Sequence, residues 1–106
     1  MNSLKGFQKR FLRGVAHSLK PLVFVGQKGF TQSLVDAMDN ALDHHELVKV
    51  KFVEFKEKEK KLALVGQIEK TVPCEMVGLV GHIATFFRQQ ADPEKRRINL
   101  PQKTDG

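Results

Sequence analysis

The sequence predicts an α/β fold, in which one compact domain has a mixed four-stranded sheet with helices packed on it. Two observations lead to this class. The chain has 106 residues, which is the size of a single domain. Stretches with apolar residues at helical spacing alternate with short apolar or alternating stretches, in the order α-β-α-β-α-β-β. Two strand–helix–strand units in succession imply right-handed crossovers and a mixed sheet.

The first third of the chain predicts a helix, a strand and the start of a second helix. Residues 3–19 carry apolar side chains at amphipathic spacing, and Pro21 is expected to end that helix. Residues 22–25 are apolar throughout and are expected to form a strand buried on both faces. After the loop 26–29, Thr31 is a suitable N-cap for the second helix. We expect four side chains of this region to lie in the core: Phe7, Phe11, Val25 and Met38.

The remaining elements follow the same reasoning. Residues 47–55 alternate around Lys49 and Lys51, which is typical of a half-buried strand. The charged run 56–61 is either a solvated turn or the start of a third helix; we favour a helix to about residue 70, with Leu62, Val65 and Ile68 on its core face. Residues 74–77 and 82–87 predict a hairpin joined by 78–81. A polar loop, 89–97, precedes a short fifth strand at 98–100, so we expect a domain over 1–101 and a frayed tail over 102–106.

The charge of the chain suggests a polyanionic partner. There are 18 lysines and arginines against 12 acidic residues, which gives a net charge of +6 and an isoelectric point near 9.7. Residues 1–35 contain six basic residues and no acidic one. Solvated lysines would also give a basic isoelectric point, but an acid-free first third favours a nucleic acid as the partner.

The sequence gives little support to several other classes of protein. The single Cys74 excludes an internal disulfide, and it fits a reducing compartment. No apolar run approaches the ~20 residues that a bilayer span needs, and no secretory signal begins the sequence, so we expect a cytoplasmic protein without a membrane partner. The pairs His44–His45 and Cys74–His82 lack the spacing of a metal or nucleophilic site. We therefore expect no enzymatic activity, metal, cofactor or small-molecule substrate.

The loop of Gly26, Gln27, Lys28 and Gly29 predicts a phosphate-binding site. Glycines allow backbone amides to approach an anion closely, and the helix that begins near Thr31 directs its unpaired amides to the same place. Lys28 adds a full positive charge. A tight turn would explain the two glycines equally well if they stood alone.

Basic residues of the first helix are the second candidate interface. Lys5, Lys9 and Arg13 are spaced four residues apart and so share one face, to which Arg10 adds a charge. A plain solvated face is the alternative for any one of them.

Three groups of residues resemble the CRM domain, specifically its small stand-alone bacterial members of the YhbY type. They are the stretch 12–52 with Leu19-Lys20-Pro21, Val25-Gly26-Gln27-Lys28-Gly29-Phe30-Thr31 and His44-His45-Glu46-Leu47, then Val80-Gly81-His82 to Phe86-Phe87-Arg88, and finally Ile98-Asn99-Leu100-Pro101. Gln27 stands where that family usually has lysine, and Phe87 where it commonly has tyrosine. The resemblance implies a fold like the C-terminal domain of translation initiation factor 3. It also implies a GxxG loop that approaches the RNA backbone as in KH domains.

Together these observations predict a monomeric RNA-binding module that binds ribosomal RNA of the large-subunit precursor and assists ribosome assembly. The association with large-subunit precursors is what the resemblance implies. Lys20, from the acid-free segment, and Arg88 complete the candidate RNA-binding residues. The alternative is a protein–protein adaptor whose basic surface makes no RNA contact. DNA binding is disfavoured because the sequence has no helix-turn-helix spacing.

Overall fold

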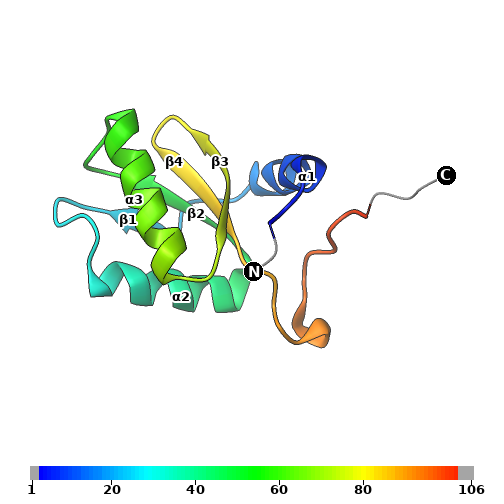
Figure 1. Cartoon of the computed structure of the whole chain (residues 1–106). Helices are drawn as coiled ribbons and strands as arrows, with labels where there is room; N and C mark the ends of the chain where they lie inside the picture. The colour runs from blue at the N-terminus through cyan, green and yellow to red at the C-terminus, as the bar shows by residue number, and fades with distance from the viewer. Residues whose placement is uncertain (1–2, 103–106) are drawn as a thin grey trace.

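Helices and strands alternate along the computed structural model, which describes residues 3–102 (Figure 1). The elements are α1 (Gly6–Ala16), β1 (Val23–Val25), α2 (Gln32–His45), β2 (Leu47–Phe52), α3 (Lys58–Thr71), β3 (Glu75–Val80), β4 (Ile83–Phe87) and the short 3-10 helix η1 (Pro93–Lys95). The predicted α/β class and the order α-β-α-β-α-β-β are confirmed. Within the described residues, no helix has the length and apolar character that crossing a membrane requires.

The four strands form one mixed sheet in the order β1-β2-β4-β3. β1 runs parallel to β2, and β4 is antiparallel to both β2 and β3. α3 connects β2 to β3, which are not neighbours in the sheet. The β3–β4 hairpin then places β4 between them. As a result β1 and β3 are the edge strands, and the carboxyl ends of β1 and β2 lie side by side.

Two hydrophobic cores lie on opposite faces of the sheet. The larger one packs α2 and α3 against all four strands, with Met38, Val50, Phe52, Ile68 and Phe86 completely buried. The smaller one packs Leu12 and Ala16 of α1 against Leu47, Val77 and Phe87. Because α1 contacts β2, β3 and β4 only along part of their length, it leaves the rest of this second face uncovered (Figure 1).

The N-terminal third differs from the predictions in three ways. The first helix is shorter than 3–19 and ends at Ala16, well before Pro21. β1 is buried on one face only: Val23 and Val25 are buried, but Phe24 is 57% exposed. The reason is that α1 does not extend over this edge strand. Phe11 is 40% exposed and not a core residue, whereas Val25 and Met38 are buried as predicted and Phe7 is half-buried.

The face of α3 was also predicted incorrectly at one position. Leu62 is exposed, and the neighbouring Lys61 is buried with Leu64, Val65 and Ile68. The ammonium of Lys61 donates a hydrogen bond to the carbonyl oxygen of Gly81. This bond gives the ammonium an acceptor and holds the β3–β4 turn against α3.

The hairpin turn lies later than predicted. Gly78, Leu79 and Val80 belong to β3, and the turn consists of Gly81 and His82, with Gly81 in the left-handed region at a φ of +58°. Val77 is the extra residue of a bulge between Met76 and Gly78. Cys74 and His82 therefore lie at opposite ends of β3, roughly 20 Å apart at ~3.3 Å per residue.

The C-terminal segment contains η1 but no strand at 98–100. Ile98 and Leu100 pack against the smaller core as an irregular chain instead. The buried carboxylate of Glu46 holds this segment, since its oxygens accept hydrogen bonds from the amides of Gln90, Arg97 and Ile98. Of the tail predicted to be frayed, residues 103–106 lie outside the described part of the chain.

Candidate nucleic-acid interface

The GxxG loop is a tight turn between β1 and α2. The amide of Gly29 donates a 3.0 Å hydrogen bond to the carbonyl oxygen of Gly26. Gly29 has a φ of +66°, and a Cβ there would lie 3.3 Å from the ring of Phe55, so glycine is needed at this position. A Cβ at Gly26 would meet open space. Gly26 is therefore the position of the loop at which another molecule can approach the backbone, with the exposed Gln27 and Lys28 beside it.

The start of α2 points into the same region. Thr31 is the N-cap, as predicted, and its hydroxyl accepts a 3.1 Å hydrogen bond from the amide of Leu34. The amides of Gln32 and Ser33 precede the first helical hydrogen bonds, so they have no acceptor within the helix and carry its positive dipole end. The first turn contains no acidic residue. Asp36, one turn further on, is hydrogen-bonded to the side chain of Gln32.

The loop is one end of a groove of about 490 Å³, which we call the loop groove. Its walls are Val23 and Phe24 of the edge strand β1 and the first turns of α2 as far as Ala37. Lys28 and the free amides of α2 provide positive charge at the loop end, and most of the remaining lining is apolar, from Val23, Phe24, Leu34 and Ala37. This combination suits a strand that has anionic groups on one side and flat, less polar groups on the other.

The basic residues of α1 lie away from this groove. α1 packs on the opposite face of the sheet from α2, and Figure 1 shows it at the other end of the molecule from the β1–α2 loop. Lys9 pairs with Glu75 at 3.1 Å, and Arg13 donates a 2.8 Å hydrogen bond to the carbonyl oxygen of Val77. Lys5 and Arg10 are exposed, and so is Lys20 in the connection to β1. The structure thus brings the loop residues and Thr31 together but separates them from the helix residues.

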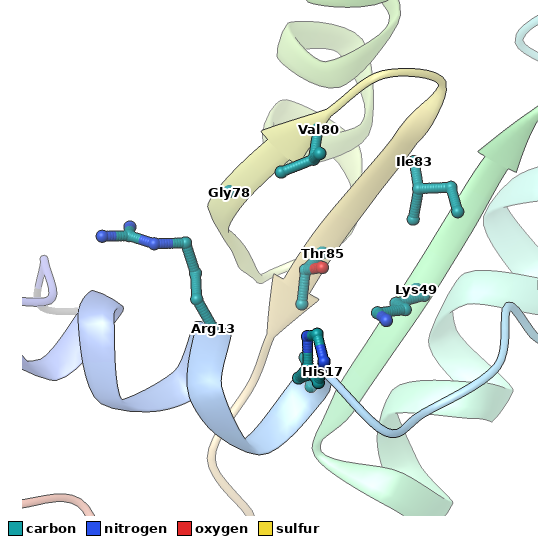
Figure 2. Close-up of a pocket in the computed structure, with 8 residues that line it drawn as sticks. Arg13, His17, Lys49, Gly78, Val80, Ile83 and Thr85 are labelled. Atoms are coloured by element: carbon teal, nitrogen blue, oxygen red, sulfur yellow. The ribbon is translucent and has the colours of Figure 1, made fainter.

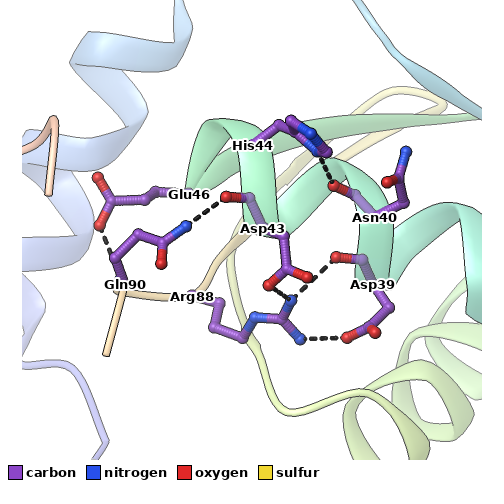
Figure 3. Close-up of polar contacts among 7 residues, drawn as sticks. All are labelled: Asp39, Asn40, Asp43, His44, Glu46, Arg88 and Gln90. Carbon is purple, nitrogen blue, oxygen red and sulfur yellow. Dashed lines mark hydrogen bonds and ion pairs between the residues drawn. The ribbon is translucent and has the colours of Figure 1, made fainter. Parts of the chain in front are cut away.

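Arg88 is held by acidic side chains. Its guanidinium contacts Asp39 at 2.6 Å and Asp43 at 2.8 Å, and the side chain is only 16% exposed (Figure 3). These contacts tie the end of β4 to the middle of α2 and neutralise part of the negative charge on that helix. Gln90 adds a hydrogen bond to the carbonyl oxygen of Asp43. We therefore place Arg88 outside the interface that we propose below.

Cys74, His82 and His44, which carry reactive side chains, lie in separate parts of the fold: before β3, in the β3–β4 turn and at the end of α2. Burial, with a smaller contribution from Glu69, raises the pKa of the Cys74 thiol to about 12. Desolvation and the positive charges of Lys61, Lys56 and Lys51 lower the pKa of His82. His44 is hydrogen-bonded to the carbonyl oxygen of Asn40. Among residues 3–102, no group of three or more His, Cys, Asp or Glu side chains is placed to hold a metal ion.

Sequence reasoning did not single out Phe24 and Lys51, which the sheet places next to each other on its exposed face. The alternation around Lys49 and Lys51 correctly predicted a solvated side of that strand. It gave no sign that an exposed aromatic ring from another strand would lie beside the lysines, because the pairing of β1 with β2 is a long-range contact.

Comparison with known proteins gives a consistent result. The family model of the CRS1/YhbY (CRM) domain matches residues 4–88. An RNA-binding protein of Haemophilus influenzae is 38% identical over 103 residues, which are 97% of this chain and 100% of the relative. The Bacillus subtilis protein named "Probable RNA-binding protein YqeI" is 31% identical over 98 residues, or 92% and 99% of the two chains. The solution structure of a Staphylococcus aureus protein has a TM-score of 0.79 at 27% identity and covers 93% of this chain and 100% of its own. The chain therefore belongs to the CRS1/YhbY (CRM) domain family.

Proposed function

We propose that this chain is an RNA-binding module without enzymatic activity, and that the loop groove binds the sugar–phosphate backbone of RNA. The observation that carries the proposal is the arrangement around Lys28. Its ammonium, the accessible backbone at Gly26 and the free amides at the start of α2 all lie at one end of the groove. The names of the relatives as RNA-binding proteins support the same assignment.

The biological target that we propose is ribosomal RNA in a precursor of the large subunit, with the protein acting as a monomeric assembly factor in the cytoplasm. This part of the proposal rests on family resemblance and on the basic charge. Co-sedimentation with ribosomal particles, followed by release on RNase treatment, is the expected behaviour. A protein–protein adaptor would remain attached after the RNA had been digested.

α1 provides a second, weaker phosphate contact in this proposal. Arg10 and Lys5 are exposed and available, whereas the ammonium of Lys9 is already paired with Glu75. Arg10→Gln should therefore flatten the dependence of log affinity on log salt by about 0.7–0.9, the value for one phosphate contact, and Lys9→Gln should flatten it less.

The direct test is RNA affinity of loop variants measured beside their thermal stability. Lys28→Ala removes one charge contact, so it should weaken binding to many RNA sequences by a similar factor, since phosphates carry no base information. The double variant Gln27→Asp, Lys28→Asp puts negative charge at the phosphate position and should weaken binding more. Both side chains are exposed, so neither variant should unfold.

Lys70→Ala is the matched control, because Lys70 is also an exposed lysine but lies in the last turn of α3. It should bind RNA like the unaltered protein. If the double aspartate variant is folded and still binds normally, the loop is only a turn and the proposal for the groove fails.

A further inference from the structure

One face of the sheet is only partly covered by a helix, and side chains from all four strands lie next to each other on it. The sheet register aligns Phe24 with Lys51, Lys51 with Ile83, and Ile83 with Val80, so these four residues form one row across β1, β2, β4 and β3. Lys49 and Thr85 are partners in the next row. Val23, Val25 and Val50 point into the larger core, so the residues of the row face the other way. We call this surface, from Phe24 to Val80, the open sheet face.

The open sheet face is apolar at its edges and positively charged between them. Phe24 is 57% exposed and Val80 is 77% exposed, and these are the two most exposed large apolar side chains of the described residues. Lys51 is exposed between Phe24 and Ile83. A single exposed apolar side chain is ordinary, but here Phe24, Ile83 and Val80 belong to one row across the sheet. A contiguous surface of this kind is typical of an interaction site.

A hollow of about 220 Å³ continues this surface toward α1 (Figure 2). Val80, Ile83, Thr85 and Lys49 of the sheet and Arg13 and His17 of the α1 region line it, although the guanidinium of Arg13 points away from the other labelled side chains in Figure 2. The ammonium of Lys49 donates one hydrogen bond to the carbonyl oxygen of Leu19, which leaves two of its three N–H donors. Within the described part of the chain, no carboxylate lines the hollow.

The charges decide which kind of molecule fits this face. A second copy of the chain, related by a two-fold axis, would bring the same patch onto itself and place Lys49 and Lys51 close to their own counterparts. An anionic strand would meet only positive charge. Its bases would also find an exposed aromatic ring, which stacks on any nucleobase regardless of sequence.

The position of Phe24 connects the face to the groove. Phe24 is a wall residue of the loop groove through β1, and it is also the first residue of the row on the open sheet face. A strand whose backbone is held at Gly26 and Lys28 can therefore pass around the exposed edge of β1 without leaving the protein. The row beyond Phe24 spans three strand spacings, about 14 Å at ~4.8 Å each.

We propose that the open sheet face binds unpaired nucleotides of the RNA, with a base stacked on Phe24 and phosphates near Lys51 and Lys49. This inference rests on the proposed function, and it specifies the ligand as single-stranded RNA next to the segment bound by the GxxG loop. Duplex RNA does not satisfy it, because its bases are stacked inside the helix and its wide minor groove offers mainly hydroxyls and phosphates.

The test compares three RNA probes of equal length with the intact protein: a single-stranded oligouridine, the same backbone with abasic sites, and a fully paired hairpin. Phe24→Ala should weaken binding to oligouridine by at least ~5-fold, the lower end of the range for loss of one stacked base. It should leave affinity for the abasic strand and for the hairpin unchanged. Lys51→Gln should weaken binding to oligouridine and to the abasic strand alike, since it removes a phosphate contact.

Two control variants match these changes. Leu62→Ala removes an exposed apolar side chain, and Lys70→Gln removes an exposed charge, both from α3 on the covered side of the sheet. Neither should change the affinity for any of the probes. Thermal unfolding should show that Phe24→Ala is about as stable as the unaltered protein, because more than half of the Phe24 side chain is exposed.

The outcomes separate the two proposals. If Lys28→Ala weakens binding while Phe24→Ala and Lys51→Gln bind oligouridine normally, the proposal for the open sheet face is wrong. The proposal for the loop groove is then unaffected. If the unaltered protein binds none of the probes, both are wrong. If the unaltered protein sediments as a dimer and Phe24→Ala as a monomer, the face is a contact between two copies, and the proposal is overturned.

Discussion

Removal of the Glu46 carboxylate should release the C-terminal segment from the domain. Glu46 is 1% exposed and lies between α2 and β2. Its Oε1 accepts hydrogen bonds from the amides of Arg97 at 2.7 Å and Ile98 at 3.1 Å, and its Oε2 from the amide of Gln90 at 2.8 Å. The Gln90 contact is visible in Figure 3. These three bonds connect the segment to the rest of the protein at two points.

Two opposing effects determine how much Glu46→Ala lowers the free energy of unfolding. Hydrogen bonds to a charged group contribute about 1.5–3 kcal/mol each, so loss of all three would approach the entire stability of a small domain. The actual loss of stability should be smaller, because the segment can detach and its amides can then form hydrogen bonds to water. Detachment gives up the burial of Ile98 and Leu100, which are half-buried side chains, and regains chain entropy. We therefore expect a loss of about 2–4 kcal/mol in the free energy of unfolding.

The backbone conformation does not complicate this comparison. Glu46 has a φ of +60°, and alanine at the same position keeps a Cβ and so keeps the same strain. Glu46→Gln is the conservative variant. Its amide keeps one oxygen as acceptor and loses the charge, so it should be destabilised by a smaller amount than Glu46→Ala.

Urea unfolding and amide hydrogen exchange together provide the measurement. In Glu46→Ala the amides of Gln90, Arg97 and Ile98 should exchange much faster, while those of β2 and β4 should keep most of their protection. Glu54→Ala, at an exposed acidic residue, should change stability by no more than about 0.5 kcal/mol. If Glu46→Ala keeps slow exchange at all three amides, the carboxylate does not anchor the segment and the reasoning is refuted.

Three shorter predictions test the site and the core. Gln27→Lys adds a charge beside Lys28, so it should raise RNA affinity and steepen the salt dependence by about 0.7–0.9, as a filter-binding titration at several salt concentrations would show; an unchanged slope would mean that position 27 does not contact phosphate. The pKa of Cys74 is about 12 in the folded protein against 9.0 for a free thiol, so its contribution to stability is present below pH 9.0 and is lost as the pH rises toward 12. Cys74→Ala should remove this part of the alkaline destabilisation, and a thiol reagent that reacts quickly with the folded protein near neutral pH would contradict the buried, protonated state. Phe86→Ala should cost about 3–5 kcal/mol in urea unfolding because Phe86 is fully buried, whereas Phe11→Ala should cost far less, and equal costs would show that Phe11 is a core residue after all.

Much of the fold could be predicted because its signals are local. The cap at Thr31 depends on the side chain of one residue and an amide three positions later, and both are readable in sequence. The buried face of α2 follows from helical spacing, which places Leu34, Met38 and Leu42 in the core. Gly26 marks the end of β1 in the same local way, whereas α1 ends at Ala16, well before Pro21. The GxxG loop was also identified correctly as a turn between a strand and a helix, for the same reason.

The features that were predicted incorrectly or not at all depend on which surfaces pack together, and no local sequence pattern contains that information. The amphipathic spacing of α1 made Phe11 a core candidate, but the helix covers only part of its sheet face and leaves that ring at the boundary. Lys61 is buried and Leu62 exposed because a turn more than 15 residues away offers the lysine a carbonyl oxygen. The sequence by itself determined the order of elements, the basic charge and the position of the GxxG loop between β1 and α2. Only the tertiary structure decided that Arg88 faces two aspartates and that Phe24 lies beside Lys51, because both are contacts between strands and helices that are distant in the chain.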